Sequence, residues 1–494
     1  MRVAIISTHD MQGGAARAAC RLHQSLRAAG VESTMLVGHK TSTDPHVAQI
    51  SDKDLPGRFF WPLVQSQVIN RQRTPRSNTL FSFASPGPDL AQHPLVRDAD
   101  VINLHWVAGF QSPVEIARLQ SLGKPVVWTL HDLRSFTGGC HYPAGCREFE
   151  RACLACPQLQ PALHELSEAA LADAKALING AALTLVTPSL WLKDEATRSA
   201  LFRNTRVETI PYGLDTGLFS PKPKTESRRR LGLEKEPVYL LFGADDGREK
   251  RKGFDLLLEA LRVCLQNPEF AEKARRGRIV ILCFGGAASR LSALSIPVQS
   301  LGRVSDDRIL ADIYSAADVF VLPSLEDNLP CTMQESMSCG TPVAGFSAGG
   351  IAEAVEDGIN GRVVPPGDAT LLAGALLQLA ADPALRESMG RAARLKAVTQ
   401  YSLNLCASRY LQLFDELRGR EVKMASAANH AEIFGDHLSP LVPGLMARAV
   451  TAYAVTKRTS LRRWLLFFQV RRGLSRARKK GWSLPETIRH LDRS

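Results

Sequence analysis

The chain has 494 residues, which is too long for one compact core, since single domains usually hold about 100–200 residues. Hydrophobic residues make up 45% and charged residues 22% of the chain, a composition that excludes a disordered or collagen-like protein. The formal net charge is +12, but thirteen Lys or Arg and only two acidic residues lie between Arg448 and the C-terminus. The excess charge therefore belongs to the tail, which excludes a basic nucleic-acid-binding body.

The first ten residues contain an apolar run that is too short for a signal peptide, and no apolar stretch reaches the roughly 18 residues of a membrane-spanning helix. We therefore expect a cytoplasmic protein that is not integral to a membrane. Six of the ten cysteines fit that compartment as buried thiols: Cys20, Cys264, Cys283, Cys331, Cys339 and Cys406.

Short β-branched runs alternate with helical patterns in both halves of the chain. This alternation is typical of parallel sheets that are covered by helices on each face. The expected strands are Arg2–Ser7, Ser33–Val37, Val101–Leu104, Pro125–Leu130 and Leu183–Thr187 in the first half, and Pro237–Phe242, Arg278–Phe284, Val319–Leu322, Thr341–Ala344 and Gly361–Val364 in the second.

Pro211, Gly213 and Pro221 interrupt any continuous element between the halves, so we expect an α/β protein with two doubly wound, Rossmann-like domains. Ligands bind at the carboxyl ends of parallel strands, and two such domains facing a central cleft favour a two-substrate enzyme. The expected boundaries are 1–209 for the first Rossmann-like domain, 210–400 for the second, 401–420 for a closing helix and 421–494 for a basic helical tail.

Gly13 and Gly14 follow the first strand and lead into a helix. Small residues let a charged or hydroxylated ligand approach the backbone amides at a helix start. A tight packing turn explains the same residues equally well, and both interpretations stay open from this segment alone.

His131 and Asp132 follow an apolar strand, which predicts that the imidazole lies at a carboxyl strand end. A neutral histidine there orients a sugar hydroxyl, and Asp132 fixes its tautomer. A capping or buried structural histidine is the alternative, which this segment alone favours.

Cys140, Cys146, Cys153 and Cys156 form a compact set of four thiols. Four thiolates suit a tetrahedral structural zinc ion. Reduced or bridged thiols are an equal alternative.

Arg248, Arg251 and Lys252 lie in a loop between a strand and a leucine-rich helix. Cations at such a strand end neutralise a diphosphate as it gains charge. A solvated charged loop is the alternative interpretation.

Asp327 and Glu335 are eight residues apart, on a loop and on the helix that follows it. Two carboxylates in these positions converge on one ligand as acceptors for ribose or sugar hydroxyls. A helix cap by Asp327 and a surface Glu335 form the alternative. Further along, Gly349 and Gly350 offer backbone amides suited to phosphate or sugar.

The second-half motifs resemble those of the retaining glycosyltransferases of family 4, which have the GT-B fold and use nucleotide sugars. The resemblance runs to about Leu417 and rests on the Glu335-Ser-Met-Ser-Cys-Gly-Thr-Pro-Val and Gly349-Gly350-Ile-Ala-Glu stretches. The first carboxylate of the family motif is generally Glu. In this chain, the residue separated from Glu335 by seven residues is Asp327, and Glu326 is one residue further away. Either Asp327 or Glu326 is therefore a candidate to face the donor.

The resemblance implies a catalytic set of His131, Lys252, Asp327 and Glu335, and no metal in catalysis. Lys252, with Arg248 or Arg251, would hold the donor diphosphate, Glu335 the ribose and Asp327 the sugar. Further donor-side residues are Gly14, Glu326, Asn328, Leu329, Gly349 and Gly350. The acceptor side comprises His105, Trp106 and Asp132.

Asn103-Leu-His-Trp, the run from Leu130 to Tyr142 and Glu326-Asp-Asn-Leu-Pro resemble transferases of bacterial exopolysaccharide clusters, similar to colanic acid transferases. The tail interleaves aromatic and basic residues, which favours an anchor on anionic lipid at the inner face of the cytoplasmic membrane. A partner-binding or solvated helix is the alternative. A second patch, Arg58-Phe-Phe-Trp with Arg71, Arg73 and Arg76, is expected to touch the same surface.

We therefore expect transfer of a sugar from a nucleotide-sugar donor to a growing, lipid-linked surface glycan such as exopolysaccharide or lipopolysaccharide, without a nucleic-acid partner. One alternative is a transferase for a soluble acceptor. The other is a non-catalytic scaffold that binds nucleotide sugars.

Overall fold

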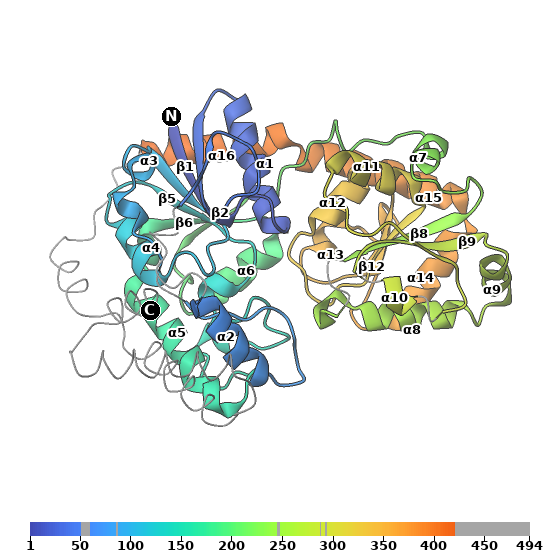
Figure 1. Ribbon diagram of the computed structural model, residues 1–494, viewed down its shortest axis with the longest axis horizontal. Coiled ribbons are helices and arrows are strands. Elements are labelled where there is room, and N and C mark those ends of the chain that lie inside the picture. The colour runs from blue at the N-terminus through green and yellow to red at the C-terminus, as the bar shows by residue number, and fades with distance from the viewer. Residues whose placement is uncertain (51–59, 85–86, 245–247, 287, 292–293, 420–494) are drawn as a thin grey trace. The chain divides into compact units, whose positions relative to one another are not determined.

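The computed structural model describes residues 1–50, 60–84, 87–244, 248–286, 288–291 and 294–419 (Figure 1). The basic tail over 421–494 lies outside these residues, as do Arg58 and Phe59 of the second basic patch. The chain forms two compact units. The first comprises Met1–Thr187, Lys193–Thr209 and the described residues from Leu411 onward, and the second comprises Pro188–Leu192 and Ile210–Tyr410.

The first unit contains a seven-stranded, all-parallel sheet in the order β3-β2-β1-β4-β5-β6-β7. Its strands are β1 (Arg2–His9), β2 (Glu32–His39), β3 (Val47–Gln49), β4 (Val101–Leu104), β5 (Val126–Thr129), β6 (Leu183–Thr187) and β7 (Arg206–Thr209). Its helices are α1 (Gly14–Ala28), α2 (Phe60–Arg71), α3 (Pro94–Arg97), α4 (Pro113–Gln120) and α5 (His164–Leu177), with short 3-10 turns at Leu90–Gln92, Arg134–Phe136, Glu148–Glu150, Pro161–Leu163 and Gly180–Ala182. Helix α6 (Leu190–Arg198) belongs to the second unit up to Leu192 and to the first unit from Lys193.

Local sequence explains where these elements begin and end. Central strands are apolar along their length because both faces of the sheet are covered, and β4 and β5 are buried at every residue. Helix α4 starts at Ser112, which forms a capping box with Glu115. Helix α1 is followed by Gly30, whose φ of 83° suits the left-handed turn after a helix.

The second unit contains a six-stranded parallel sheet in the order β10-β9-β8-β11-β12-β13. Its strands are β8 (Val238–Ala244), β9 (Ile279–Gly285), β10 (Val298–Ser300), β11 (Val319–Leu322), β12 (Val343–Phe346) and β13 (Gly361–Val364). Its helices are α7 (Lys224–Arg230), α8 (Phe254–Cys264), α9 (Pro268–Arg275), α10 (Ala288–Leu291), α11 (Asp307–Ala316), α12 (Cys331–Ser338), α13 (Ile351–Ala354), α14 (Ala369–Ala381) and α15 (Pro383–Tyr401), with a 3-10 turn at Lys250–Lys252.

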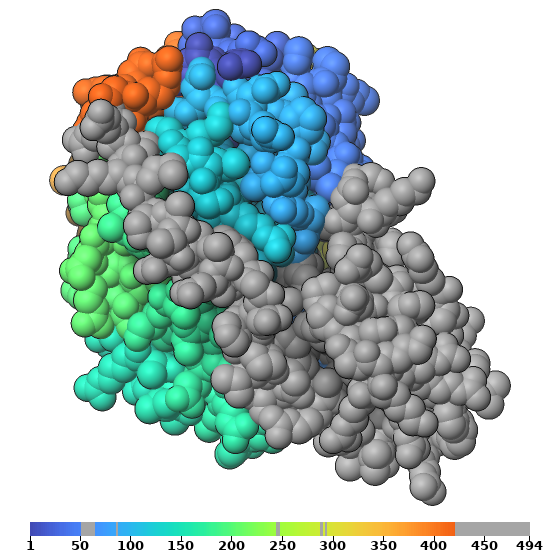
Figure 2. Space-filling view, turned by 90° about the vertical axis from the view of Figure 1, so that its left-hand side faces the viewer, coloured from blue at the N-terminus to red at the C-terminus, as the bar shows by residue number. Residues whose placement is uncertain are grey.

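Helix α16 (Leu403–Arg418) belongs to the second unit up to Tyr410 and to the first unit from Leu411. In the first unit, Arg206 of β7 donates two hydrogen bonds of 2.9 Å to the carboxylate of Glu416. The end of α16 lies close to the start of the chain, and Figure 2 shows its orange atoms next to the blue atoms of the N-terminal segment. No helix within the described ranges is long and apolar enough to cross a membrane.

The expected pair of doubly wound α/β units is confirmed, and each of the ten predicted strands is present within a few residues of its expected bounds. Three further strands, β3, β7 and β10, were not predicted. All three are edge strands of three or four residues, and such short strands leave little sequence pattern.

Candidate functional site

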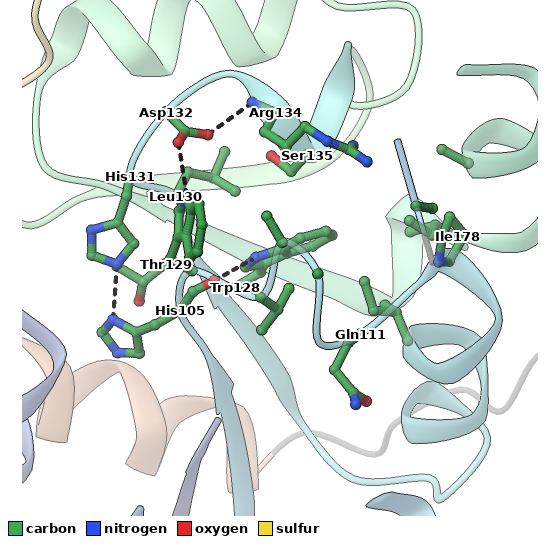
Figure 3. Close-up of a pocket in the computed structure, with 18 of the residues that line it drawn as sticks. His105, Gln111, Trp128, Thr129, Leu130, His131, Asp132, Arg134, Ser135 and Ile178 are labelled. Atoms are coloured by element: carbon green, nitrogen blue, oxygen red, sulfur yellow. Dashed lines mark hydrogen bonds between the residues drawn. The ribbon is translucent and has the colours of Figure 1, made fainter. Parts of the chain in front are cut away.

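In the first unit, two histidines meet at the carboxyl ends of neighbouring strands. His105 follows β4 and His131 follows β5, and Nδ1 of His105 lies 3.0 Å from Nε2 of His131 (Figure 3). On its other side, Nε2 of His105 lies 3.0 Å from Oδ1 of Asn103. Asn103, His105 and His131 therefore form a continuous hydrogen-bonded chain, and all three are buried.

The orientation of Asn103 determines where the protons of this chain lie. Its amide nitrogen donates to the Val127 carbonyl oxygen and to Oγ1 of Thr129, both at 3.1 Å, so its oxygen faces His105 as an acceptor. His105 then carries its proton on Nε2, and its Nδ1 accepts from Nε2–H of His131. It follows that Nδ1 of His131 carries the lone pair.

Burial keeps both imidazoles neutral. It lowers the pKa of His131 to about 4, although the nearby Asp132 opposes this shift. Burial, and then the neighbouring His131, also holds the pKa of His105 well below its ordinary value of 6.5. Near pH 7 this pair offers neutral donors and acceptors.

Asp132 organises a second set of contacts beside the histidine pair. Its Oδ2 accepts from Nε1 of Trp106 at 2.9 Å and lies 2.7 Å from Nδ1 of His141, and its Oδ1 accepts from the backbone N–H of Arg134. Burial acts to raise the pKa of Asp132, but His141 and the other donors outweigh it and lower the pKa to about 2. We expected Asp132 to fix the tautomer of His131. That expectation is corrected, because Asn103 fixes it through His105 while the Asp132 carboxylate orients Trp106 and His141.

These residues border a pocket between the ends of β4 and β5 and helices α4 and α5 (Figure 3). The predicted acceptor-side residues His105, Trp106 and Asp132 all line it, together with His131. One side of the pocket is polar. The other side is apolar and is formed by Pro113, Ile116, Trp128, Leu130, Ala170, Ala174 and Ile178.

Gly14 begins α1 in the same unit, after a loop held by a buried carboxylate. Asp10 accepts hydrogen bonds from the backbone N–H groups of Thr41 and Ser42 and from the Thr41 hydroxyl. Gly13 and Gly14 are exposed, and Gly13 has a φ of 86°. The helix start is therefore accessible, and the positive φ accounts for the glycine at position 13.

In the second unit, the predicted basic loop contacts the predicted carboxylate loop directly. Nζ of Lys252 lies 2.6 Å from Oδ2 of Asp327, and Nη1 of Arg251 lies 3.4 Å from Oδ1 of the same carboxylate. Arg251 also donates to the carbonyl oxygen of Glu326 at 2.9 Å. Arg248 is exposed in the same loop. Asp327 therefore joins the two loops through ion pairs, and the backbone N–H of Leu325 adds a hydrogen bond of 2.7 Å to the Arg251 carbonyl oxygen.

Gly253 explains how these loops come so close. It has a φ of 65°, and a Cβ atom there would lie 1.7 Å from the carbonyl oxygen of Pro323. Only glycine fits this position, which directly follows Lys252.

Asp327 and Glu335 are both buried, with exposed fractions of 6% and 2%, but they have different partners. Burial acts to raise the pKa of Asp327, and Lys252 and then Arg251 reverse the shift and lower it below 3.8. Glu335 on α12 accepts a hydrogen bond from Oη of Tyr314 at 3.1 Å. The alternative of a surface Glu335 is therefore wrong. So is a capping role for Asp327 on α12, since that helix has Pro330 at its N-cap.

Gly349 and Gly350 pack against the carboxylate loop. Cβ atoms there would lie 1.9 Å from the carbonyl oxygen of Asp327 and 1.8 Å from that of Asn328. The N–H of Gly350 donates to the Asp327 carbonyl oxygen at 3.2 Å. The expectation of bare amides for a ligand is thus corrected at Gly350, because close packing of the two loops requires the glycines.

Ser189 and Glu353 tie the segment after β6 to the second unit. Oγ of Ser189 donates to Oδ1 of Asn328 at 2.6 Å. Glu353 accepts from the first backbone N–H groups of α6, those of Leu190 and Trp191, at 2.8 and 2.6 Å. Asn328 and the neighbouring Leu329 are buried, so both support the loop from within.

Two family models match the chain, one described as Glycosyltransferase Family 4 over residues 12–218 and one described as Glycosyl transferases group 1 over residues 236–382. The chain therefore contains two glycosyltransferase domains, one of family 4 and one of group 1. A D-inositol 3-phosphate glycosyltransferase of Thermobispora bispora is 32% identical over 225 residues, which cover 43% of this chain and 50% of the relative. The chain thus spans about half the length of the curated relatives it matches.

Solved structures share the fold of this glycosyltransferase. Sucrose-phosphate synthase from Thermosynechococcus elongatus superimposes with a TM-score of 0.59 at 21% identity, over 84% of this chain and 99% of that one. HepE of Anabaena, solved with UDP and glucose, gives a TM-score of 0.56 at 17% identity over 84% and 99% of the two chains. These similarities show the GT-B fold.

Sequence reasoning missed several polar residues of the candidate sites in the two units. Asn103 and His141 lay inside stretches that were quoted for the family resemblance, but no pattern singled them out. Tyr314 is far from Glu335 in the sequence and lies on a different helix. The pocket of the first unit is also lined by Gln111, Arg134 and Ser135, and no sequence motif identified these residues as functional.

The described arginines of the second basic patch differ in their exposure. Arg73 points inward, where it donates to the Thr79 carbonyl oxygen, and its guanidinium lies 5.4 Å from the centre of the Phe81 ring. Arg76 donates to the Ala144 carbonyl oxygen at 2.9 Å. Arg73 is therefore half-buried and held by these contacts, whereas Arg71 and Arg76 are exposed.

Proposed function

We propose that the chain transfers a sugar from a nucleotide-sugar donor to a growing glycan with retention of anomeric configuration. The observation that carries the proposal is the contact of Lys252 and Arg251 with Asp327, held by a glycine that no other residue can replace. This cluster lies in the unit that the group 1 model matches. The UDP and glucose bound by HepE, which shares the fold, support the same class of donor.

The donor role follows from the charge of the cluster. The Lys252 side chain is 27% exposed and that of Arg251 is 15% exposed, so both cations are partly desolvated. Asp327 holds them in place before a ligand binds. A diphosphate gains negative charge as it leaves the sugar, and preorganised cations stabilise that charge most strongly where water is excluded.

His131 contributes through its neutral ring. With its proton on Nε2 and the lone pair on Nδ1, it accepts a hydrogen bond from a hydroxyl of the reacting sugar. Its lowered pKa keeps a positive charge away from an anomeric carbon that gains oxocarbenium character. Asn103 and His105 act as positioning residues, because they determine which nitrogen carries the proton.

The bond changes of the reaction balance without a metal ion or an enzyme nucleophile. The bond between the anomeric carbon and the phosphate oxygen breaks, and the diphosphate takes the electron pair. The acceptor oxygen forms the new bond on the same face and gives its proton to the leaving phosphate. Retention by this route is what the family resemblance implies, and the cations of the loop take the part that a divalent ion plays elsewhere.

We further propose a lipid-linked acceptor of the exopolysaccharide or lipopolysaccharide type, with the basic tail at the inner face of the cytoplasmic membrane. Support comes from the resemblance to exopolysaccharide transferases and from the composition of the tail. The pocket of the first unit, which is apolar on one side, suits an acceptor with both polar and apolar parts.

A second candidate is transfer to a small soluble acceptor. The names of the relative from Thermobispora bispora and of the synthase from Thermosynechococcus elongatus favour it, since both indicate phosphorylated, water-soluble compounds. Activity that persists in solution without lipid extract would support this candidate.

A donor screen tests the proposal. Binding and slow hydrolysis of UDP-, GDP- and ADP-sugars are compared in the wild type, in Lys252→Ala and in Lys273→Ala, a surface control on α9. We expect one nucleotide class to bind the wild type and the control but not Lys252→Ala. Binding that is equal in all three proteins would contradict the donor role of this cluster.

A further inference from the structure

The connection from β5 to α5 is long, ordered and almost without regular structure. Over residues 130–163 it contains only three 3-10 turns, at Arg134–Phe136, Glu148–Glu150 and Pro161–Leu163. Loops of this length in a compact domain usually serve a function. This one is well packed, since Leu133, Phe136, Phe149 and Leu159 expose 2% or less. Something must hold it in a single conformation.

The four clustered cysteines are all in this connection and border one pocket. Cys140, Cys153 and Cys156 are buried and Cys146 is half-buried, and all four are free thiols. Phe81 and Phe149 line the same pocket, so part of its wall is apolar. The other six cysteines of the chain do not line this pocket.

Backbone N–H groups are directed at these sulfur atoms. The N–H of Glu148 donates to Sγ of Cys146 at 3.4 Å, and the N–H of Gly138 donates to Sγ of Cys153 at 3.3 Å. The backbone of Gln158 also donates to Cys156. Hydrogen bonds of this kind stabilise a thiolate more than a thiol, as they do around metal-bound ligands.

The backbone of the segment is strained. Among the described residues, Ala144 and Cys153 are the non-glycine residues with positive φ, at 50° and 54°. Both lie between Cys140 and Cys156. Such conformations persist where the surrounding structure imposes them, and they concentrate at functional sites.

Two guanidinium groups balance the charge that four thiolates would bring. Arg73 lies near Cys156 and Cys140, and Arg134 lies near Cys140. Nε of Arg73 is buried and has no hydrogen-bond partner among the described atoms. Four thiolates around a divalent ion carry a net charge of −2, which two neighbouring guanidinium groups neutralise.

We propose that Cys140, Cys146, Cys153 and Cys156 bind one zinc ion as four thiolates and that this ion braces the site of the first unit. Tetrahedral thiolate coordination is the geometry of closed structural zinc sites. Across the described part of the chain, no three His, Cys, Asp or Glu side chains are already grouped for a metal. Binding therefore requires the four thiols to turn toward one another across their shared pocket.

The ion would act on the site through one residue. His141 directly follows Cys140, and its Nδ1 lies 2.7 Å from Oδ2 of Asp132, next to His131. Fixing Cys140 therefore fixes His141, and His141 orients Asp132. The role of the ion is structural, since His141 is a positioning residue.

Metal analysis of the full-length protein tests this inference independently of transfer. The protein is purified without a histidine tag, under reducing conditions and without added metal, and zinc, iron and free thiols are counted per chain. We expect one zinc ion in the wild type and in Cys331→Ser, and none in the Cys153→Ser/Cys156→Ser double variant. We also expect a fall in Tm when a chelator removes the ion. The four cysteines lie in the first unit and the donor cluster lies in the second, so donor binding can be measured independently of the zinc content.

A second measurement uses the wild type alone and tests the proposal even if the double variant does not fold. Cobalt is exchanged into the wild type, and a tetrahedral thiolate site gives intense visible absorption. Zinc-free protein with four reactive thiols, a disulfide among these cysteines, or iron in place of zinc would each overturn the proposal. Zinc that remains in the folded double variant would show an adventitious ion only and would overturn it as well.

Discussion

Nζ of Lys252 and Oδ2 of Asp327 lie 2.6 Å apart, and this ion pair joins the basic loop before α8 to the loop that follows β11. The ion pair accounts for a buried carboxylate at position 327 and for a lysine at position 252. Asp327 is nearly fully buried, and the two cations balance its charge beside the hydrogen bond that it accepts from the Asn328 N–H. The cations in turn are held ready for a more highly charged ligand.

Lys252→Ala is expected to weaken donor binding by about tenfold to a hundredfold, since each tenfold corresponds to about 1.4 kcal/mol. It also leaves Asp327 with Arg251 alone, and we expect a loss of about 1–2 kcal/mol in unfolding free energy. Calorimetric titration and urea unfolding measure the two effects. Lys273→Ala on α9 is the control, and an equal loss of donor binding in that variant would refute the assignment.

Gly253→Ala is expected to abolish donor binding and to lower Tm by several degrees, because the new Cβ would collide with the Pro323 carbonyl oxygen. Gly277→Ala is a matched control. Its φ of 67° is nearly the same, but nothing lies within 4 Å of the added atom. If both variants lose donor binding equally, backbone strain and not the contact of the loops is responsible.

Asn103→Leu is expected to reduce kcat strongly while leaving donor Kd unchanged. Without the amide oxygen, His105 no longer has a fixed tautomer, and neither does His131. The variant also leaves the Val127 carbonyl and the Thr129 hydroxyl short of a partner, at about 1–3 kcal/mol of stability. Nitrogen NMR of the ring tautomers separates the two effects, since a purely structural loss would leave the surviving folded protein with the original tautomer of His131.

The neutral His131 predicts a specific pH dependence of stability. Its folded pKa of about 4 is below the ordinary 6.5, so the unfolded chain takes up a proton that the folded chain refuses between these values. The contribution is complete above pH 6.5 and is lost as pH falls toward 4, by about 3 kcal/mol at most. Urea unfolding of the wild type and of His131→Asn over this range measures it. Identical slopes would contradict a buried neutral ring.

The composition of the tail predicts that the protein binds anionic vesicles and that added salt weakens this binding. Each basic residue near a charged leaflet contributes about 1 kcal/mol, so Arg462→Gln/Arg463→Gln is expected to weaken partitioning about thirtyfold. The adjacent and highly exposed pair Arg275 and Arg276 gives a matched control, Arg275→Gln/Arg276→Gln. Vesicle flotation with and without phosphatidylglycerol distinguishes them, and equal binding of both variants would argue against the tail as the anchor.

Much of the fold could be predicted from the sequence because central parallel strands are buried on both faces. Val319–Leu322 is a continuous apolar run, Val101–Leu104 is apolar except for Asn103, and the observed bounds of both strands match the predicted ones. The edge strand β7 contains Arg206 and Glu208 and has only one neighbour, so packing imposes no such pattern on it. The hydrophobic pattern of a sequence therefore predicts strands that are buried on both faces, but it does not predict short strands at the edges of a sheet.

The site could be predicted in its charged residues but not in its partners. His131, Lys252 and Asp327 follow strands and are recognisable from that position alone. Asn103 and Tyr314 depend on which strands and helices become neighbours, which the sequence does not state. Gly350 shows a different limit, because glycine beside a ligand and glycine beside another loop look the same in a sequence.

Transfer itself is the most direct test of the account. The wild type, Lys252→Ala and Lys273→Ala are incubated with the nucleotide sugar found by the donor screen and with a lipid extract, and the anomeric configuration of the product is determined by NMR. We predict that the wild type and Lys273→Ala attach the sugar to the lipid fraction with retained configuration and that Lys252→Ala does not. A protein that binds the donor but neither transfers nor hydrolyses it would be a nucleotide-sugar-binding scaffold, which would contradict the catalytic assignment.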